Sequence, residues 1–268
     1  AQDVPLGFEC AGTVIAVGPD VKDLKLGDQV IANTEGSFAS YVTVDSALVS
    51  RKPANIPFEA AAGIPTAFLT AYYGINELAD LKAGDKILIQ SAAGGVGQAA
   101  VQLAQAAGAE IYATASPAKW NALKAQGIKH VMNSRTLDFA DEILRLTDNQ
   151  GVDVVLNSLN GDFINKSFDV LSKGGRFVEI GKIGVWSQEQ AAEYRADAVY
   201  LPFDLGEVTG EDLGLMTRML SELVQQFENG VLHALPQTTF PIEQVANAYR
   251  YMQQTKHIGK VVLTYKDI

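Results

Sequence analysis

Residues 91–97, Ser-Ala-Ala-Gly-Gly-Val-Gly, form a glycine-rich segment whose backbone N–H groups could bind an anion. An apolar run precedes the segment and an alanine-rich helical pattern follows it. A strand that leads through such a turn into a helix directs N–H groups and the positive end of the helix dipole at a phosphate. Gly94 and Gly97 hold the second and third glycine places of a dinucleotide fingerprint, with Ala92 at the first. The segment predicts a dinucleotide site that also includes Ala93, Gly95 and Val96; the alternative is a tight turn with a purely structural role.

The residues after the next predicted strand bear on which dinucleotide is bound. In NAD-selective sites an acidic residue there binds the ribose 2′-hydroxyl. Here the strand is followed by Ser116-Pro-Ala-Lys119, with neither Asp nor Glu. Ser116 and Lys119 offer a hydroxyl and a cation to a 2′-phosphate, and Arg135 could add a guanidinium beside the adenosine. The pattern favours NADPH over NADH, unless the two cations are only solvated surface charges.

The elements that must position these residues alternate between strand and helix from Asp85 to about Pro202. Such alternation predicts an α/β fold, an open parallel sheet with helices on both faces. The predicted strands are 86–90, 110–115, 130–133, 152–157, 176–180 and 198–201. The predicted helices between them are 96–107, 117–126, 138–147 and 162–171.

The two ends of the chain have a different pattern. Short β-branched runs at 13–17, 29–32 and 39–44 predict a β-rich first segment, followed by helices at 57–62 and 65–78. Apolar residues at helical spacing predict a long amphipathic helix over 211–229. The tail from Thr238 predicts a strand, a helix and a last strand at 260–265.

Composition excludes several classes of function. The net charge of −10 disfavours a nucleic-acid partner, because phosphates would be repelled. Cys10 is the only cysteine, so an intrachain disulfide is impossible and a cytoplasmic location fits best. The sequence has no apolar run long enough to span a membrane. It also has no export signal. The chain begins with Ala rather than Met, which suggests a piece of a longer polypeptide.

Six motifs spread over nearly the whole chain resemble the medium-chain dehydrogenase/reductase superfamily, and within it the enoyl reductase domain of modular polyketide synthases. They are residues 6–13, 64–73, 91–97, 151–159, 174–182 and 257–262. The resemblance implies a Rossmann-type doubly wound parallel sheet inserted into a β-rich GroES-like substrate domain. The expected bounds are 1–62 and 233–268 for the substrate domain and 63–232 for the NADPH-binding domain.

Zinc-dependent relatives hold a catalytic metal with Cys and His side chains. This chain has one Cys and three His, and Phe8 stands where those relatives place a His ligand. A thiolate and imidazole site cannot be assembled from these residues, so no metal is expected.

The resemblance implies a reaction, which is hydride transfer from NADPH to the β-carbon of an α,β-unsaturated thioester on an acyl carrier protein. Neighbouring megasynthase domains are then the other expected partners. Lys182 and Asp204 match the Lys and Asp proposed as proton donors in this family. The alternative for this pair is a structural ion pair that joins two loops. Family members also carry further strands ahead of Pro5, with a tyrosine linked to proton delivery in some, and no residue here takes that role.

The same resemblance implies further cofactor contacts outside the glycine-rich turn. They are Thr66, Thr70, Asn157, Ser158, Leu159, Gly181, Gly259 and Lys260.

Three alternatives to a carrier-dependent reductase remain open. The first is a free-standing NADPH quinone or enone oxidoreductase. The second is an enoyl reductase homologue with an altered outcome, because an enolate with a leaving group at the γ-carbon can close a ring. The third is a module that binds a nucleotide without catalysis. The sequence indicates neither the acyl chain nor an oligomeric state.

Overall fold

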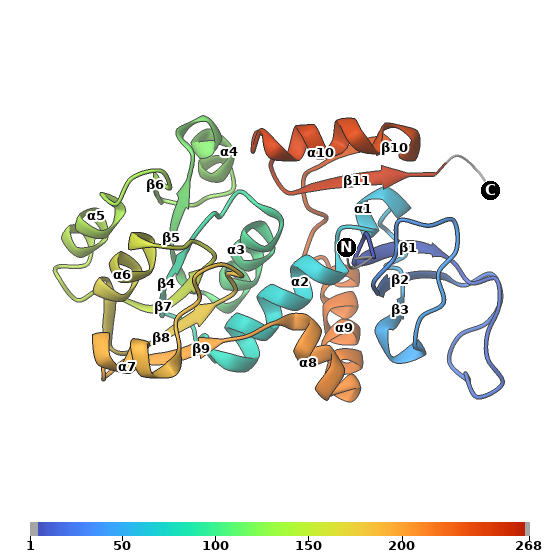
Figure 1. Cartoon of the computed structure of the whole chain (residues 1–268), viewed down its shortest axis with the longest axis horizontal. Coiled ribbons are helices and arrows are strands. Elements are labelled where there is room, and N and C mark those ends of the chain that lie inside the picture. The colour runs from blue at the N-terminus through green and yellow to red at the C-terminus, as the bar shows by residue number, and fades with distance from the viewer. Residues whose placement is uncertain (1–4, 266–268) are drawn as a thin grey trace. The chain divides into compact units, whose positions relative to one another are not determined.

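The strands between residues 86 and 202 form one six-stranded parallel sheet (Figure 1). The computed structural model describes residues 5–265. The strands lie in the order β6-β5-β4-β7-β8-β9, and every neighbouring pair is parallel. Counted along the chain this is the order 3-2-1-4-5-6, with a switch point between β4 and β7 where doubly wound folds bind ligands. The bounds are β4 Lys86–Ile89, β5 Glu110–Ala115, β6 His130–Asn133, β7 Val152–Asn157, β8 Leu171–Glu179 and β9 Val199–Pro202.

The predicted sheet is confirmed, and one of its strands is longer than predicted. The sequence predicted a strand at 176–180, whereas β8 begins at Leu171. Lys173, Gly174 and Gly175 are poor strand formers, and Gly174 has a φ of 74°, so this stretch is typical of a loop. The register between β7 and β8 shifts between Val152 and Val154, which accommodates the irregular stretch.

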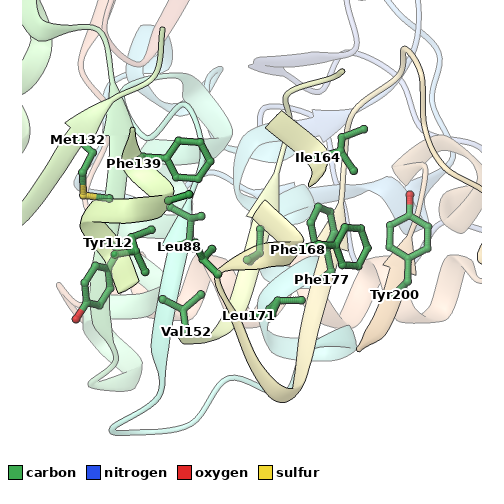
Figure 2. Close-up of a cluster of buried hydrophobic side chains, with 14 of the residues drawn as sticks. Leu88, Tyr112, Met132, Phe139, Val152, Ile164, Phe168, Leu171, Phe177 and Tyr200 are labelled. Atoms are coloured by element: carbon green, nitrogen blue, oxygen red, sulfur yellow. The ribbon is translucent and has the colours of Figure 1, made fainter. Parts of the chain in front are cut away.

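Helices cover the sheet with apolar side chains. The bounds are α3 Gly95–Ala107, α4 Trp120–Ala125, α5 Phe139–Leu146, α6 Asp162–Asp169 and α7 Gln188–Tyr194. On one face, shown in Figure 2, Phe168 of α6 stacks on Phe177 of β8 with ring centroids 4.1 Å apart. Leu88, Tyr112, Phe139 and Tyr200 extend this cluster across the sheet (Figure 2). Burying each side chain of this size stabilises the fold by about 1.5–3 kcal/mol.

The helix α7 was not predicted from the sequence, and one predicted helix differs in type from the one observed. A capping box marks the start of α7, since Ser187 and Gln190 bond reciprocally to each other's backbone N–H. The Ser-x-x-Gln spacing was therefore a usable signal. The helix predicted over 65–78 is an α-helix only in α2, Pro65–Tyr72, and continues as the π-helix η2, Tyr73–Leu78.

Contacts divide the chain into two compact units, residues 70–208 and residues 1–69 with 209–268. The second unit holds an antiparallel sheet in the order β1-β2-β3 and a parallel pair, β10 and β11. Its elements are β1 Glu9–Thr13, β2 Gln29–Asn33, β3 Val49–Arg51, α1 Phe58–Ala61, α9 Leu213–Glu228, β10 Gln237–Pro241, α10 Val245–Gln253 and β11 Lys260–Thr264. The helix α8, Leu205–Glu211, was not predicted, because the helix expected in this part of the chain began at Glu211. The domain bounds expected from the sequence stay predictions.

Two strands predicted in the first segment were wrong. The strand expected at 13–17 lies at Glu9–Thr13, where it pairs with β2. This stretch contains Ala11 and Gly12, which are weak strand formers, so the long-range pairing outweighs local preference. Residues 39–44 form no strand among the residues that the structure describes, and Tyr41 there is exposed.

Candidate functional site

The glycine-rich turn leaves the start of α3 open to an anion. Ser91 takes a left-handed φ of 53° at the end of β4, and the Gly94 N–H closes the turn onto the Ser91 carbonyl at 2.9 Å. Gly94 is the N-cap of α3, no side chain caps the helix, and its first turn has no acidic residue. The first N–H groups of a helix have no partner within it, so they are available to a phosphate.

The two glycines of the turn have different roles. A Cβ on Gly97 would lie 2.5 Å from the Ser91 carbonyl oxygen and 2.6 Å from the Ala92 Cα. Only glycine allows this close approach of α3 to the strand end. A Cβ on Gly94 would meet only the Ser91 oxygen, at 3.4 Å, so the fold itself tolerates a side chain there. Gly94 instead leaves space for a ligand beside the helix start.

Lys119 follows β5 and Arg135 follows β6, and the two side chains are close enough for their charges to interact. Burial, followed by the nearby charge of Arg135, lowers the pKa of Lys119. Among residues 5–265 neither side chain takes part in an ion pair. Ser116 begins this loop and its hydroxyl caps nothing. Two neighbouring cations without a carboxylate form a site that fits a dianionic phosphate.

Asn157 and Glu179 form a buried polar pair at the carboxyl ends of β7 and β8. They are 0% and 1% exposed, and the Asn157 Nδ2 donates to the Glu179 Oε2 at 2.7 Å. The Gly181 N–H donates to the other carboxylate oxygen at 2.6 Å. Burial raises the pKa of Glu179, while its bonds to Asn157 and the backbone oppose that rise. Sequence reasoning did not assign Glu179 a role; its place three residues before Lys182, at a strand end, was the available signal.

Lys182 and Asp204 form an ion pair at the same edge. The Lys182 ammonium donates to the Asp204 carboxylate at 2.5 Å, and the side chains are 59% and 42% exposed. The Gly206 N–H donates to the second carboxylate oxygen at 2.7 Å. The bond from Lys182 is the main reason that the pKa of Asp204 lies below its usual value. The two residues that the sequence singled out together thus bond to each other in the structure.

The lowered pKa gives a pH prediction for this pair. A carboxyl group with a lowered folded pKa contributes stability above its unfolded pKa, about 3.9, and loses it as the pH falls through the folded value. Because both groups are more than one-third exposed, we expect Asp204→Asn to lower the free energy of unfolding by less than about 1 kcal/mol at pH 7. Urea unfolding at pH 7 and pH 3 should show a smaller difference between variant and wild type at pH 3. A difference that grows at pH 3 would contradict the assigned ion pair.

Three other predicted residues lie together in the unit that holds β1 and β11. The Thr66 N–H, at the start of α2, donates to the Glu9 carboxylate at 2.8 Å, and Lys260 forms an ion pair with the same carboxylate. Gly259 has a φ of 71°, and a Cβ there would lie 2.0 Å from the Pro236 carbonyl oxygen. Thr66 and Thr70 lie one turn apart on α2 and are partly exposed, while the three residues between them are buried.

Residues 5–265 hold neither a metal-binding cluster nor a membrane-spanning helix. Residues 5–265 contain no group of three or more His, Cys, Asp or Glu side chains arranged to hold a metal ion. In the same residues no helix is both long and apolar enough to cross a membrane.

Comparisons with known proteins agree with this geometry. The family described as "Zinc-binding dehydrogenase" matches residues 126–263, and "Alcohol dehydrogenase GroES-like domain" matches residues 1–54. Component PikAII of the pikromycin polyketide synthase from Streptomyces venezuelae is 45% identical over 97% of this chain. The chain spans only 7% of the length of that relative.

Two solved structures superpose on most of the chain. The crystal structure of CurK enoyl reductase is 52% identical, with a TM-score of 0.96, and the match covers 99% of this chain and 80% of that one. The CurF ER cyclopropanase of the curacin A pathway is 46% identical, with a TM-score of 0.94, covering 97% and 78%. The Rossmann-type sheet and the GroES-like first segment, expected from the sequence, are confirmed.

Proposed function

Since the chain belongs to the enoyl reductases of polyketide synthases, within the medium-chain dehydrogenase/reductase superfamily, we propose that it reduces an α,β-unsaturated acyl thioester with NADPH. The thioester is carried by an acyl carrier protein, and neighbouring domains of a megasynthase deliver it. The Lys182–Asp204 ion pair at the carboxyl edge of β8 and β9 is the observation that carries this proposal, because it places a cation and a proton source at the ligand-binding edge.

The residues of the structure fit NADPH. The uncapped start of α3 would hold the pyrophosphate, and Gly94 leaves space for it. Lys119, Arg135 and Ser116 would hold the 2′-phosphate. The backbone from Asn157 to Leu159 and at Gly181 would border the nicotinamide ribose, with Thr66, Thr70, Gly259 and Lys260 as further contacts. When bound, NADPH supplies the hydride.

The role of the ion pair follows from where charge develops. Addition of hydride to the β-carbon places negative charge on the thioester oxygen, and the α-carbon must then take a proton. The Lys182 ammonium would stabilise the enolate or donate that proton, and Asp204 would orient it.

We expect Lys182→Met to lower kcat by about 100-fold, the usual effect of losing one donor to a developing oxyanion. Because the side chain is exposed, the fold and the affinity for NADPH should be unchanged. Stopped-flow absorbance at the NADPH band measures the rate. Lys173→Met, which removes an exposed cation from the opposite end of β8, is the matched control. If the two variants had the same kcat, Lys182 would have only the structural role of joining two loops.

The function itself is tested with two substrates. The assay uses the longest natural polypeptide that contains this sequence, together with NADPH. Its substrates are a crotonyl thioester on pantetheine, the same thioester on a carrier protein, and a simple quinone. We expect the thioester to be reduced faster, and fastest on the carrier. Faster reduction of the quinone would instead favour a free-standing quinone or enone oxidoreductase. Binding of NADPH without reduction of either would favour a nucleotide-binding module.

A second candidate is reductive ring closure, which the similarity to the CurF cyclopropanase favours. A crotonyl thioester with a halogen at the γ-carbon separates the two outcomes. A reductase protonates the enolate and retains the halogen, whereas ring closure releases halide as the α-carbon attacks the γ-carbon. We propose the first outcome.

A further inference from the structure

The buried pair at the ends of β7 and β8 connects the two loops that the proposed function uses. Asn157 and Glu179 are opposite each other in the parallel register, and each is the last residue of its strand. The segment after Asn157 carries Ser158 and Leu159, and the segment after Glu179 carries Gly181 and Lys182. One hydrogen bond between two buried side chains therefore lies directly beneath both segments.

Nearly every further contact of the pair is with the backbone of these loops. The Asn157 Nδ2 also donates to the Leu159 carbonyl at 2.7 Å, and the Asn157 Oδ1 accepts the Leu159 N–H at 3.2 Å. The Glu179 Oε1 accepts the Gly181 N–H at 2.6 Å. A Cβ on Gly181 would lie 2.7 Å from that oxygen, so the second loop closes tightly over the carboxylate. The pair thus fixes the shape of both loops.

The donors and acceptors fit only one arrangement. A carboxylate accepts at both oxygens, and here one faces an amide NH₂ and the other a backbone N–H. A glutamine at 179 has the same size, but its NH₂ would face one of these two donors. A buried carboxylate is also costly unless it is fully bonded, and a pair of apolar side chains would often stabilise a sheet as well or better. The pair is therefore better explained by what it holds in place than by stability.

We propose that Glu179 is a positioning residue, which through Asn157 and Gly181 holds the two loops in the orientation that the nicotinamide and the Lys182 ammonium require. The inference rests on the proposed function. Glu179 is 1% exposed and acts through other groups, so it does not touch the reacting atoms.

Glu179→Gln tests the proposal without a change of volume. We expect faster hydrogen–deuterium exchange at Leu159 and Gly181, and a fall in kcat of about 10- to 100-fold, the effect of a small misplacement at the reacting centre. The affinity for NADPH, measured by titration of its fluorescence, should weaken as well. Asp153→Asn is the matched control, because Asp153 accepts the Lys86 N–H at 2.8 Å near the start of β7, the strand that Asn157 ends. This control should lose stability and keep its kcat.

A second variant guards against a simple loss of stability. In the double variant Asn157→Asp with Glu179→Gln, the new amide NH₂ at position 179 can donate to the new carboxylate at position 157, while the amide oxygen accepts the Gly181 N–H. The Leu159 carbonyl loses the donor that Asn157 provided, so only the bonds that hold the Gly181 loop are restored. We expect exchange protection at Gly181 to return together with part of kcat. The proposal is overturned if Glu179→Gln keeps the wild-type kcat and NADPH affinity, or if the double variant regains thermal stability and protection at Gly181 with no gain in kcat over Glu179→Gln.

The exchange and affinity measurements need no thioester. If the wild type binds NADPH yet reduces no thioester, the proposed function fails, and positioning by Glu179 is judged on NADPH affinity and on exchange at Gly181. Unchanged values for both would then overturn it.

Discussion

Gly97→Ala is expected to destabilise the unit that holds the parallel sheet by about 3 kcal/mol or more, the upper range for overpacking. The added Cβ would lie 2.5 Å from the Ser91 oxygen and within 3 Å of two Ala92 backbone atoms, none of which can rotate away. Thermal unfolding measures the change, and a fall in Tm of roughly 6–12 °C corresponds to that energy in a chain of this size.

Two further variants distinguish an effect on stability from an effect on NADPH binding. Gly94→Ala should have the same Tm as the wild type, because its Cβ meets only one oxygen at 3.4 Å. It should, however, bind NADPH more weakly. Gly210→Ala in α8 has nothing within 4 Å of its Cβ and serves as the control. If the Tm of Gly97→Ala equalled that of Gly210→Ala, the close approach of α3 to the strand end would be disproved.

Removing the cation of Lys119 or Arg135 is expected to weaken NADPH binding by about 10- to 100-fold for each residue, while NADH binding stays unchanged. The magnitude follows from about 1.5–3 kcal/mol for a hydrogen bond to a charged group. Lys119→Ala and Arg135→Ala are titrated with both coenzymes. Since burial and Arg135 both disfavour the charged Lys119, neither variant should lower the stability of the free protein.

Lys124→Ala is the matched control for these cations. Its ammonium lies over the Trp120 ring, 5.6 Å from the centroid, and it follows Lys119 in the same segment. If Lys124→Ala lowered the affinity for NADPH by the same factor, the effect would come from net charge and not from a specific contact. An equal loss of NADH affinity in Lys119→Ala would place that side chain away from the 2′-phosphate.

Much of the parallel sheet was predictable because its information is local. The strands β5, β6 and β7 have the bounds that their apolar runs predicted, and the turn at Gly94 and Gly97 carries its own signature. β1 was misplaced because its identity comes from pairing with β2, and not from strand-forming side chains. The π-helix η2 continues α2 without a break, so the pattern of apolar residues could not distinguish the two helix types.

The candidate site was less predictable, because its pairings join distant parts of the sequence. Lys182 and Asp204 were each expected at the ligand-binding edge, and only the structure shows that they bond. Lys260 was expected to contact a cofactor, and its partner Glu9 is 251 residues away along the chain. Glu179 looks like an ordinary strand residue until its neighbours are known.

The division of the chain also sets an order for its synthesis. The unit of residues 1–69 is completed by residues 209–268, and the strand β3 near its start packs on α9 near its end. At 5–20 residues per second, a ribosome needs about 7–28 s to translate the intervening residues 70–208. During that interval the nascent β1–β3 hairpins lack the helix that covers them, while the parallel sheet can already close once β9 has left the exit tunnel. The unit of residues 70–208 is therefore expected to fold before the unit of residues 1–69 and 209–268 is complete.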